Sequence, residues 1–333
     1  MKELKISVGM WYMGATGDRF VKAGYRPDRT IEERFDAAGK IPEVRGLEMH
    51  YPTEINDRTY KSLKKRAVDM NLEFVMLTPH LWIDPVYKFG QFSNPDKALR
   101  RRAIDFAKRT TEVGAELGVR FMCYWPAQDG YDYPFQTDFP RRWDALAEGL
   151  AEWADFNPKQ QIVVEYKAYD PRSHILLPNV GQAVTLLNEI NRPNLGLNIE
   201  TGHALIIHES LAETFAFALR YKRLFHTHWN DNSKMYDDDA MVGMVNLWET
   251  VELLFWLDEL GYDGWFGLDL FPFREMPEDA VAQSIANIRM GYRMLERVDR
   301  NELRACFQTS DAIAIARLMR RMLGEAAHED GPP

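Results

Sequence analysis

The sequence predicts an α/β fold in which eight strand-helix units close into a (β/α)8 barrel. Short runs of β-branched and aromatic residues alternate with longer amphipathic segments of helical period, and this alternation occurs eight times. The strand-like runs are almost continuously apolar, as expected for parallel strands buried on both faces. The chain has 333 residues, and barrels of this kind, called TIM barrels, commonly form one unit of about 250 residues. We therefore expect a TIM barrel with a short C-terminal helical extension.

The expected elements follow one another along most of the chain. The eight strands are predicted at residues 5–11, 46–51, 73–79, 120–125, 161–167, 195–201, 223–229 and 265–271. The clearest helices between and after them are predicted at residues 95–117, 140–156, 247–260 and 278–298. A doubly wound sheet would show the same alternation with fewer strands. It would also show a glycine-rich turn after its first strand, and no G-x-G-x-x-G follows residues 5–11. The barrel is favoured.

The C-terminal part of the chain exceeds what a barrel needs. We expect the barrel to occupy residues 1–298 and a helical extension with a tail to occupy residues 299–333, because a further helical pattern runs over 301–323. The last residues, 329–333, are expected to fray. The apolar positions of the extension would pack on the same subunit or on a neighbour; they include Leu303, Phe307, Ile313, Ile315, Leu318 and Met322.

Composition excludes several classes of protein. The formal net charge is −9, so nucleic acid and anionic membranes are poor partners. A hydrophobic content of 46% with 12% aromatic residues excludes a disordered chain. No stretch approaches the roughly 20 apolar residues of a membrane span, and no export signal is visible. Cys123 and Cys306 cannot build a disulfide framework. These features predict a cytoplasmic protein in a reducing compartment.

Polar side chains gather at the predicted C-terminal ends of the strands. In eight-stranded α/β barrels these ends and the loops after them converge on one mouth, where the chemistry takes place. Carboxylates inside apolar strands are costly to bury without a partner of opposite charge. The residues concerned are His50, Trp125, Glu165, Lys167, Glu200, His203, His226, His228 and Asp269. We therefore expect a functional site at this mouth.

Two divalent cations would balance the charge of this site. Five carboxylates carry −5, two divalent ions carry +4, and Lys167 carries +1, which sums to zero. The carboxylates are those of Glu165, Glu200, Asp237, Asp239 and Asp269. Oxygen-rich sets with one or two imidazoles suit Mg²⁺, Mn²⁺ or Co²⁺ better than a structural zinc.

Each of these residues has an ordinary explanation when taken alone. A glutamate at a strand end is usually solvated or ion-paired, and the run 237–239 could be an acidic surface turn. His50 alone would more often be a hydrogen-bonded barrel histidine than a catalyst. His80, His174 and His208 are expected to be structural or to lie at the surface. The ordinary explanations would have to hold together on successive strands of one mouth, which favours the metal site.

Several segments resemble the metal-dependent aldose isomerases of the xylose isomerase type. Residues 164–172, Val-Glu-Tyr-Lys-Ala-Tyr-Asp-Pro-Arg, resemble the Glu-x-Lys-x-x-acidic-Pro-Arg strand end of that family. Residues 196–203 are similar to its next strand, where a Glu and a His three residues later bind metal. Residues 9–11 and 84–92, together with Trp125, also resemble segments of xylose isomerases. The resemblance spans residues 6–274.

The seventh strand departs from the xylose isomerase pattern. That enzyme has His-x-Asp where this chain has His226-Thr227-His228. The following residues 230–239 resemble the loop of L-rhamnose isomerases, which use the first and third Asp of the triplet. This difference does not change the expected fold or reaction type, but it leaves the identity of the sugar substrate undetermined.

The resemblance implies a function and a set of site residues. It implies an aldose-ketose isomerase that acts on a free monosaccharide by a 1,2-hydride shift with two divalent cations. One metal site would consist of Glu165, Glu200, His228 and Asp269, and a second of Glu200, His203, Asp237 and Asp239. Lys167 would bind the substrate O1, His50 would help to open the sugar ring, and Asp237 or Asp239 would accept a proton. Trp11, Trp82 and Trp125 would exclude water from the migrating hydrogen.

The family also implies an assembly. Phe20, in the loop after the first strand, resembles a residue that reaches into the site of a neighbouring subunit, so a homotetramer is expected.

Three alternatives remain at this point. A ketose 3-epimerase or a sugar lyase on the same barrel would use proton transfer, with two carboxylates and generally a single metal. Lys167 and the Asp237 and Asp239 pair favour the isomerase. An endonuclease on this barrel is disfavoured by the net charge of −9 and the lack of a basic groove. A barrel that binds sugar without catalysis is disfavoured by Lys167.

Overall fold

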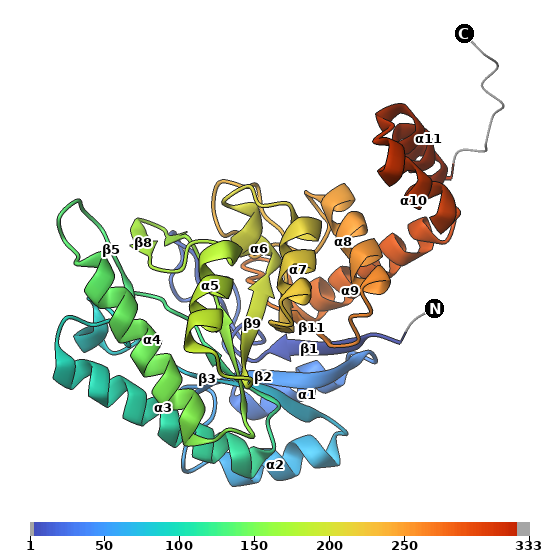
Figure 1. Cartoon of the computed structure of the whole chain (residues 1–333). Helices are drawn as coiled ribbons and strands as arrows, with labels where there is room; N and C mark the ends of the chain where they lie inside the picture. Colours follow the sequence, from blue (N-terminus) through green and yellow to red (C-terminus); the bar gives the residue numbers. More distant parts are fainter. Residues whose placement is uncertain (1–2, 325–333) are drawn as a thin grey trace, which may run out of the picture.

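Eight parallel strands close into a barrel at the centre of the molecule (Figure 1). The structure is a computed structural model and describes residues 3–324. Around the barrel the strands follow the order β1, β11, β10, β9, β6, β4, β3, β2. Their bounds are β1 (Lys5–Gly9), β2 (Val44–Tyr51), β3 (Glu73–Pro79), β4 (Phe121–Tyr124), β6 (Gln161–Glu165), β9 (Leu195–Glu200), β10 (Leu224–Trp229) and β11 (Trp265–Leu268). The predicted TIM barrel is confirmed.

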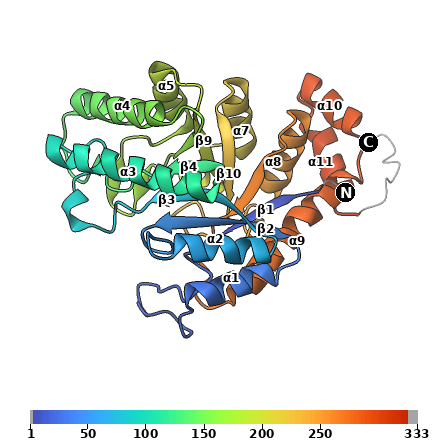
Figure 2. The same cartoon turned by 90° about the horizontal axis from the view of Figure 1, so that it is seen from below.

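Helices surround the strands on the outside of the barrel (Figure 2). They are α1 (Ile31–Gly39), α2 (Tyr60–Asp69), α3 (Lys97–Leu117), α4 (Phe139–Phe156), α5 (Val180–Ile190), α7 (Leu211–Arg220), α8 (Leu247–Glu259) and α9 (Pro277–Leu295). The short helix α6 (Thr201–Leu205) follows β9 directly and is buried, and the 3₁₀ turn η1 (Pro85–Tyr87) follows β3. The helices begin at cues in the sequence. For example, the side chain of Asp96 accepts a hydrogen bond from Ala98 N and caps the start of α3, and Gly118, with φ of 81°, caps its end after Leu117.

Several strands, most clearly β1, β6 and β11, end earlier at the mouth than the sequence predicts. The sheet ends at Gly9, Glu165 and Leu268, so Trp11, Lys167 and the residues after Leu268 lie in loops. The backbone N–H groups of these loop residues form hydrogen bonds with residues outside the barrel strands. For example, Lys167 N donates to Leu177 O. Three short strands that the sequence did not predict form a separate sheet: β5 (Gly130–Tyr131), β7 (Tyr169–Asp170) and β8 (Ser173–Ile175).

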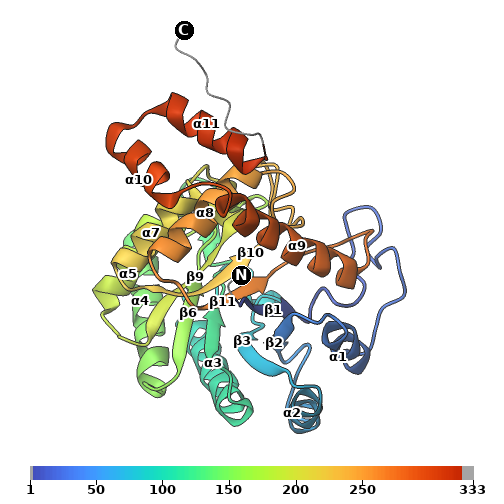
Figure 3. The same ribbon diagram turned by 90° about the vertical axis from the view of Figure 1, so that its right-hand side faces the viewer.

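The C-terminal extension consists of two helices, α10 (Arg300–Thr309) and α11 (Ala312–Met322), which lie beyond α8 and α9 (Figures 1 and 3). The predicted C-terminal helical extension is confirmed, and the helical pattern over 301–323 is divided between two helices. Ser310 takes a left-handed conformation with φ of 54°, and Asp311 caps α11 by accepting from Ile313 N and Ala314 N.

The extension packs against the barrel of its own chain. The ring of Phe307 stacks on Trp256 of α8 at 5.5 Å between centroids, and Leu303, Leu318 and Met322 are buried. Ile313 is exposed. The domain boundary at residue 298 stays a prediction, and the expected frayed tail 329–333 lies outside the described residues. None of the helices within residues 3–324 has the length and apolar character that a membrane crossing needs.

The loop after β10, residues 230–246, is held at its base by Asp231. The buried carboxylate of Asp231 accepts hydrogen bonds from the backbone N–H groups of Asn232, Val245 and Asn246 and from the side chain of Asn246. Asp231 also pairs with Ala240 in an antiparallel bridge. Both ends of the loop are therefore tied to one side chain, which fixes how the residues between them sit over the barrel.

Replacing this carboxylate should loosen the loop without unfolding the barrel. In Asp231→Ala three backbone amides lose a charged acceptor, and such a bond contributes about 1.5–3 kcal/mol. We expect amide hydrogen exchange in residues 232–246 to accelerate about tenfold or more, measured by mass spectrometry. Asp238→Ala is the matched control, because Asp238 is exposed and bonds only to Ser233 in the same loop. Equal exchange rates in the two variants would contradict the role of Asp231.

Candidate functional site

A cavity of about 370 Å³ opens at the C-terminal ends of the barrel strands. Twelve residues predicted for the site line this cavity: Trp11, His50, Trp82, Trp125, Glu165, Lys167, Glu200, His203, His228, Asp237, Asp239 and Asp269. Phe20 does not line it; this side chain is 83% exposed in the loop after β1. The fold thus brings together side chains from strand ends and loops that are far apart in the sequence.

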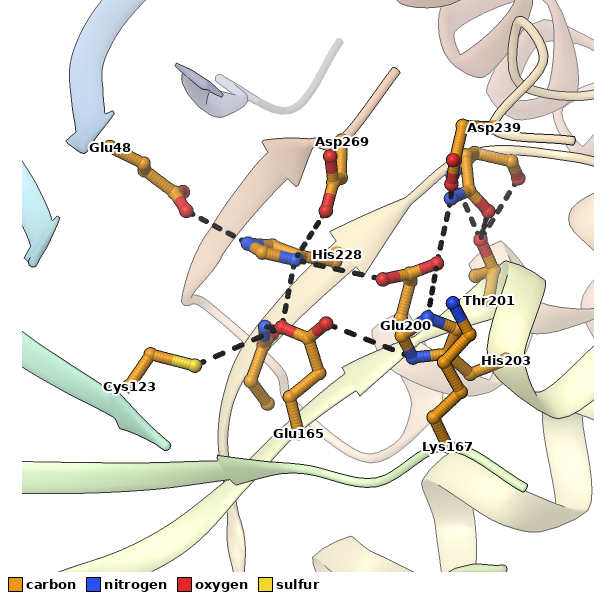
Figure 4. A network of polar contacts seen from close by, with 12 residues as sticks. Glu48, Cys123, Glu165, Lys167, Glu200, Thr201, His203, His228, Asp239 and Asp269 are labelled. Carbon is orange, nitrogen blue, oxygen red and sulfur yellow. Dashed lines mark hydrogen bonds and ion pairs between the residues drawn. The ribbon is translucent and has the colours of Figure 1, made fainter. Parts of the chain in front are cut away.

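His228 stands at the centre of a first group of possible metal ligands (Figure 4). Its Nδ1 lies 3.1 Å from Glu165 Oε2, 3.3 Å from Asp269 Oδ2 and 4.0 Å from Glu200 Oε2. One ligand atom from each of these four residues lies within 4.8 Å of the others. Three of the four side chains are buried and Asp269 is partly buried, so the group is shielded from solvent.

A second group shares Glu200 with the first. His203 Nε2 lies 3.2 Å from Glu200 Oε1 and 3.1 Å from Asp237 Oδ2, and these three residues also offer ligand atoms within 4.8 Å of one another. Asp239 was expected in this group, but it does not belong to the set that meets this spacing. Its Oδ1 accepts instead from Asn230 Nδ2, which also donates to Glu200 Oε1.

Two acidic side chains of the site are shifted toward their neutral forms. Burial, followed by the charges of Asp237, Glu165 and Asp269, raises the pKa of Glu200 well above its usual range. Burial and the charges of Asp237 and Asp269 likewise raise the pKa of Asp239. The chain thus places more carboxylates here than its own cations neutralise, so added positive charge would stabilise the ionised site.

Two other carboxylates have cationic partners. Burial alone would raise the pKa of Glu165, but the charge of His228 and its hydrogen bond outweigh burial and lower this pKa to about 2. Burial also opposes ionisation of Asp237, and the charges of His203 and Lys167 lower its pKa nevertheless. Asp237 therefore stays ionised beside the second group.

The donor atoms of the two groups fit divalent cations. Nδ1 of His228 and Nε2 of His203 both face carboxylate oxygens, and Oδ1 of Asp237 is buried without a hydrogen-bond partner. Buried polar atoms nearly always have a partner, so the unsatisfied oxygen of Asp237 indicates room for a further binding partner at the second group. Mixed carboxylate and imidazole donors are suited to Mg²⁺, Mn²⁺ or Co²⁺.

Lys167 joins the second group to the aromatic side of the cavity. Its Nζ lies 2.7 Å from Asp237 Oδ2 and 2.9 Å from Asp170 Oδ2, and it sits 5.4 Å from the ring centre of Trp125. Burial alone would lower the pKa of Lys167, but the charges of Asp237 and Asp170 raise it. The group is therefore a buried, permanently protonated hydrogen-bond donor.

A row of aromatic rings forms the opposite wall. Centroid distances are 4.6 Å from Trp11 to His50, 4.5 Å from His50 to His80, 4.4 Å from His80 to Trp82 and 4.7 Å from Trp82 to Trp125. His50 also lies 3.0 Å from the carboxylate of Glu54, measured from Nδ1 to Oε2.

His80 corrects an expectation. It was expected to be structural or at the surface, yet it lines the cavity and its Nδ1 lies 2.6 Å from Thr53 Oγ1. Burial, together with the nearby charge of His50, lowers the pKa of His80 to about 3, so it is a neutral ring. Its position directly after β3 was the available signal. His174 and His208 are exposed, as expected.

Three buried polar residues that support the site were missed. The carboxylate of Glu48 in β2 lies 2.8 Å from Nε2 of His228, and Asn198 Nδ2 donates to Glu165 Oε2 at 2.6 Å. Asn230 is the third. Each is a polar residue inside or next to an apolar strand. The same feature identified the site residues that the sequence analysis did predict, so it could have identified these three as well. Cys123 is a buried free thiol, and its Sγ lies 3.8 Å from Glu165 Oε2.

The chain is similar to proteins of one family. The family model described as "Xylose isomerase-like TIM barrel" matches residues 35–290. A xylose isomerase from Thermus thermophilus is 28% identical over 299 residues, which cover 84% of this chain and 76% of that protein.

Solved structures share the fold at low sequence identity. A D-tagatose 3-epimerase-like protein aligns over 88% of this chain and 98% of its own, with a TM-score of 0.67 and 17% identity. A 3-keto-D-glucoside 4-epimerase from E. coli aligns over 86% and 99%, with a TM-score of 0.66 and 14% identity. An L-ribulose 3-epimerase aligns over 99% and 100%, with a TM-score of 0.64 and 15% identity. Because the family model covers most of the chain, the protein belongs to the xylose isomerase-like TIM barrel family.

Proposed function

We propose that the protein is a metal-dependent sugar enzyme and, more closely, an aldose-ketose isomerase that works by a 1,2-hydride shift on a free monosaccharide similar to L-rhamnose or D-xylose. The observation that carries the proposal is the sharing of Glu200 by two ligand groups, with the buried ammonium group of Lys167 beside the second. A cavity of about 370 Å³ suits a small substrate. The 28% identity with a protein named xylose isomerase supports the same class.

Two divalent cations, Mg²⁺, Mn²⁺ or Co²⁺, would be the cofactors. Glu165, Glu200, His228 and Asp269 would hold one, and Glu200, His203 and Asp237 the other, with Asp239 held near the second through Asn230. When bound, these cations would polarise the O1 and O2 oxygens of the sugar as negative charge develops on them.

Lys167 would hold the O1 end of the open-chain sugar. Its raised pKa keeps it protonated, so it donates a hydrogen bond to an oxygen on which negative charge develops. Asp237 has one oxygen engaged by Lys167, while its Oδ1 has no hydrogen-bond partner. That oxygen would accept the proton that leaves the substrate hydroxyl before the hydrogen moves between the carbons.

The aromatic wall would serve ring opening and the exclusion of water. His50, paired with Glu54, would transfer the proton needed to open the sugar ring. Trp11, Trp82 and Trp125 would cover the migrating hydrogen, because indole rings displace water from that side of the cavity. A homotetramer in which Phe20 approaches the site of a neighbouring subunit stays a prediction.

A ketose 3-epimerase or sugar lyase is the second candidate. The four-residue group around His228 would by itself hold one cation, with the carboxylates of Glu165 and Asp269 both close to it. Such enzymes abstract a proton and return it, so the hydrogen exchanges with solvent, whereas a hydride shift keeps the hydrogen within the sugar.

A panel of aldoses assayed in D₂O tests the proposal. The protein is first stripped of metal with a chelator and then supplied with Mg²⁺, Mn²⁺ or Co²⁺. We expect conversion of at least one aldose to its ketose only with added metal, without deuterium at the reacting carbons, as judged by NMR of the product. Deuterium at the reacting carbon during turnover would contradict the hydride shift. Turnover of ketoses alone would favour the epimerase.

Replacing Lys167 should separate catalysis from metal binding. Lys167→Met removes the donor to O1 and leaves every proposed ligand in place, so we expect kcat to fall about 10²–10³-fold. Metal content, measured by atomic emission, should stay that of the wild type. Lys234→Met is the matched control, because Lys234 lies in the 230–246 loop and pairs with Glu249 outside the cavity lining. Unchanged turnover in Lys167→Met would show that the lysine has another role.

A further inference from the structure

We propose that Glu48 is a positioning residue, which holds the imidazole of His228 in the tautomer and orientation that direct Nδ1 toward the first ligand group. The inference rests on the metal-binding part of the proposed function and not on the sugar or the reaction.

The contact crosses the interior of the barrel. Glu48 lies in β2 and His228 in β10, strands that are not neighbours in the barrel order, and both side chains are almost completely buried. Glu48 Oε2 lies 2.8 Å from His228 Nε2. An ionised carboxylate only accepts hydrogen bonds, so the neutral imidazole that binds a metal carries its single proton on Nε2. In that neutral form Nδ1 on the other side of the ring keeps its lone pair.

That lone pair faces the first ligand group. His228 Nδ1 lies 3.1 Å from Glu165 Oε2 and 3.3 Å from Asp269 Oδ2, so it points into the group of carboxylates (Figure 4). A histidine that binds a metal through one ring nitrogen typically donates its other N–H to a carboxylate or carbonyl, which fixes the ring. Glu48 occupies the place of that acceptor.

Glu48 itself is held from several sides. Its Oε1 lies 2.9 Å from His226 Nε2 and accepts from Ser7 Oγ at 2.6 Å. Both carboxylate oxygens therefore have partners, and the side chain has little freedom to turn away from His228.

The backbone of β11 leaves room for this arrangement. A Cβ atom at Gly267 would lie 2.6 Å from Glu48 Oε1, 2.9 Å from His226 Nε2 and 2.9 Å from His228 Cδ2. Any larger residue at this position would push against all three side chains. Gly267 thus supplies the space in which the carboxylate meets both imidazoles, which is a second observation independent of the hydrogen bonds.

The isosteric variant Glu48→Gln changes the proton pattern and not the shape. A glutamine amide has one acceptor oxygen and one donor NH₂ group, so it cannot accept from both imidazoles with separate oxygens. When the NH₂ group faces His228, this imidazole would move its proton to Nδ1 and lose the lone pair that it needs to bind a metal. Losing such a supporting partner typically weakens metal affinity by about 10–100-fold.

The test measures metal binding and the position of the histidine proton, without any sugar. Metal-free wild type, Glu48→Gln, Gly267→Ala and Glu73→Gln are titrated with Mn²⁺ by calorimetry. We expect binding about 10–100-fold weaker in Glu48→Gln and weaker in Gly267→Ala, which displaces Glu48 without altering any charge. Glu73→Gln is the control with affinity close to the wild type, because Glu73 is exposed at the start of β3 and does not line the cavity. In ¹⁵N NMR of the Zn²⁺-loaded wild type, His228 should carry its proton on Nε2.

The outcomes separate this inference from the proposed function. If the wild type binds Mn²⁺ and the folded Glu48→Gln and Gly267→Ala variants bind it equally well, the inference is overturned and the isomerase proposal stands. A proton on Nδ1 of His228 in the Zn²⁺-loaded protein would overturn it as well. If the wild type binds no divalent ion, both fail. Should Glu48→Gln not fold, Gly267→Ala and the NMR result decide.

Discussion

Mutual repulsion among buried carboxylates is the constraint on which the rest of this site depends. Glu165, Glu200 and Asp269 approach one imidazole, and Asp237 lies against another, in a largely buried setting where solvent screens charges less than in bulk water. The chain answers this repulsion with Lys167, two histidines and donated amide hydrogens. The pKa of Glu200 is nevertheless raised, because burial and the charges of Asp237, Glu165 and Asp269 all oppose its ionisation. Cations bound at this mouth would complete the charge balance.

The barrel makes such a cluster possible because the residues that stabilise the fold are separate from those that form the site. The strands are packed largely with apolar side chains below the mouth, while their C-terminal ends and the loops after them carry most of the polar residues of the site. The loop over residues 230–246 is an example of a loop whose position is fixed by its own hydrogen bonds. Asp231 ties its two ends, so Asp237 and Asp239 are brought to the cavity by a braced segment instead of a free one.

The sequence predicted the fold and most of the cavity lining, and its misses share a physical cause. The alternation of strands and helices is a local pattern, so eight strands could be recognised from the sequence. Because the strand ends of one barrel meet at the same mouth, the residues at those ends could then be predicted to line one cavity. Glu48 was missed because its role depends on a contact across 180 residues to His228. His80 was missed because its place in the cavity wall depends on ring contacts with His50 and Trp82. The break at Ser310 was signalled by the capping residue Asp311, but an apolar helical pattern on both sides concealed it.

The central claim is that Glu200 belongs to two cation sites at once, and the metal content of a single variant tests it most directly. Glu200→Gln keeps the shape of the side chain and removes its charge. Emission spectroscopy after loading with Mn²⁺ should find two ions per wild-type chain and a loss of both in the variant. The exposed Glu213→Gln in α7 should bind as the wild type does. Two ions retained by Glu200→Gln would contradict the shared role of this carboxylate.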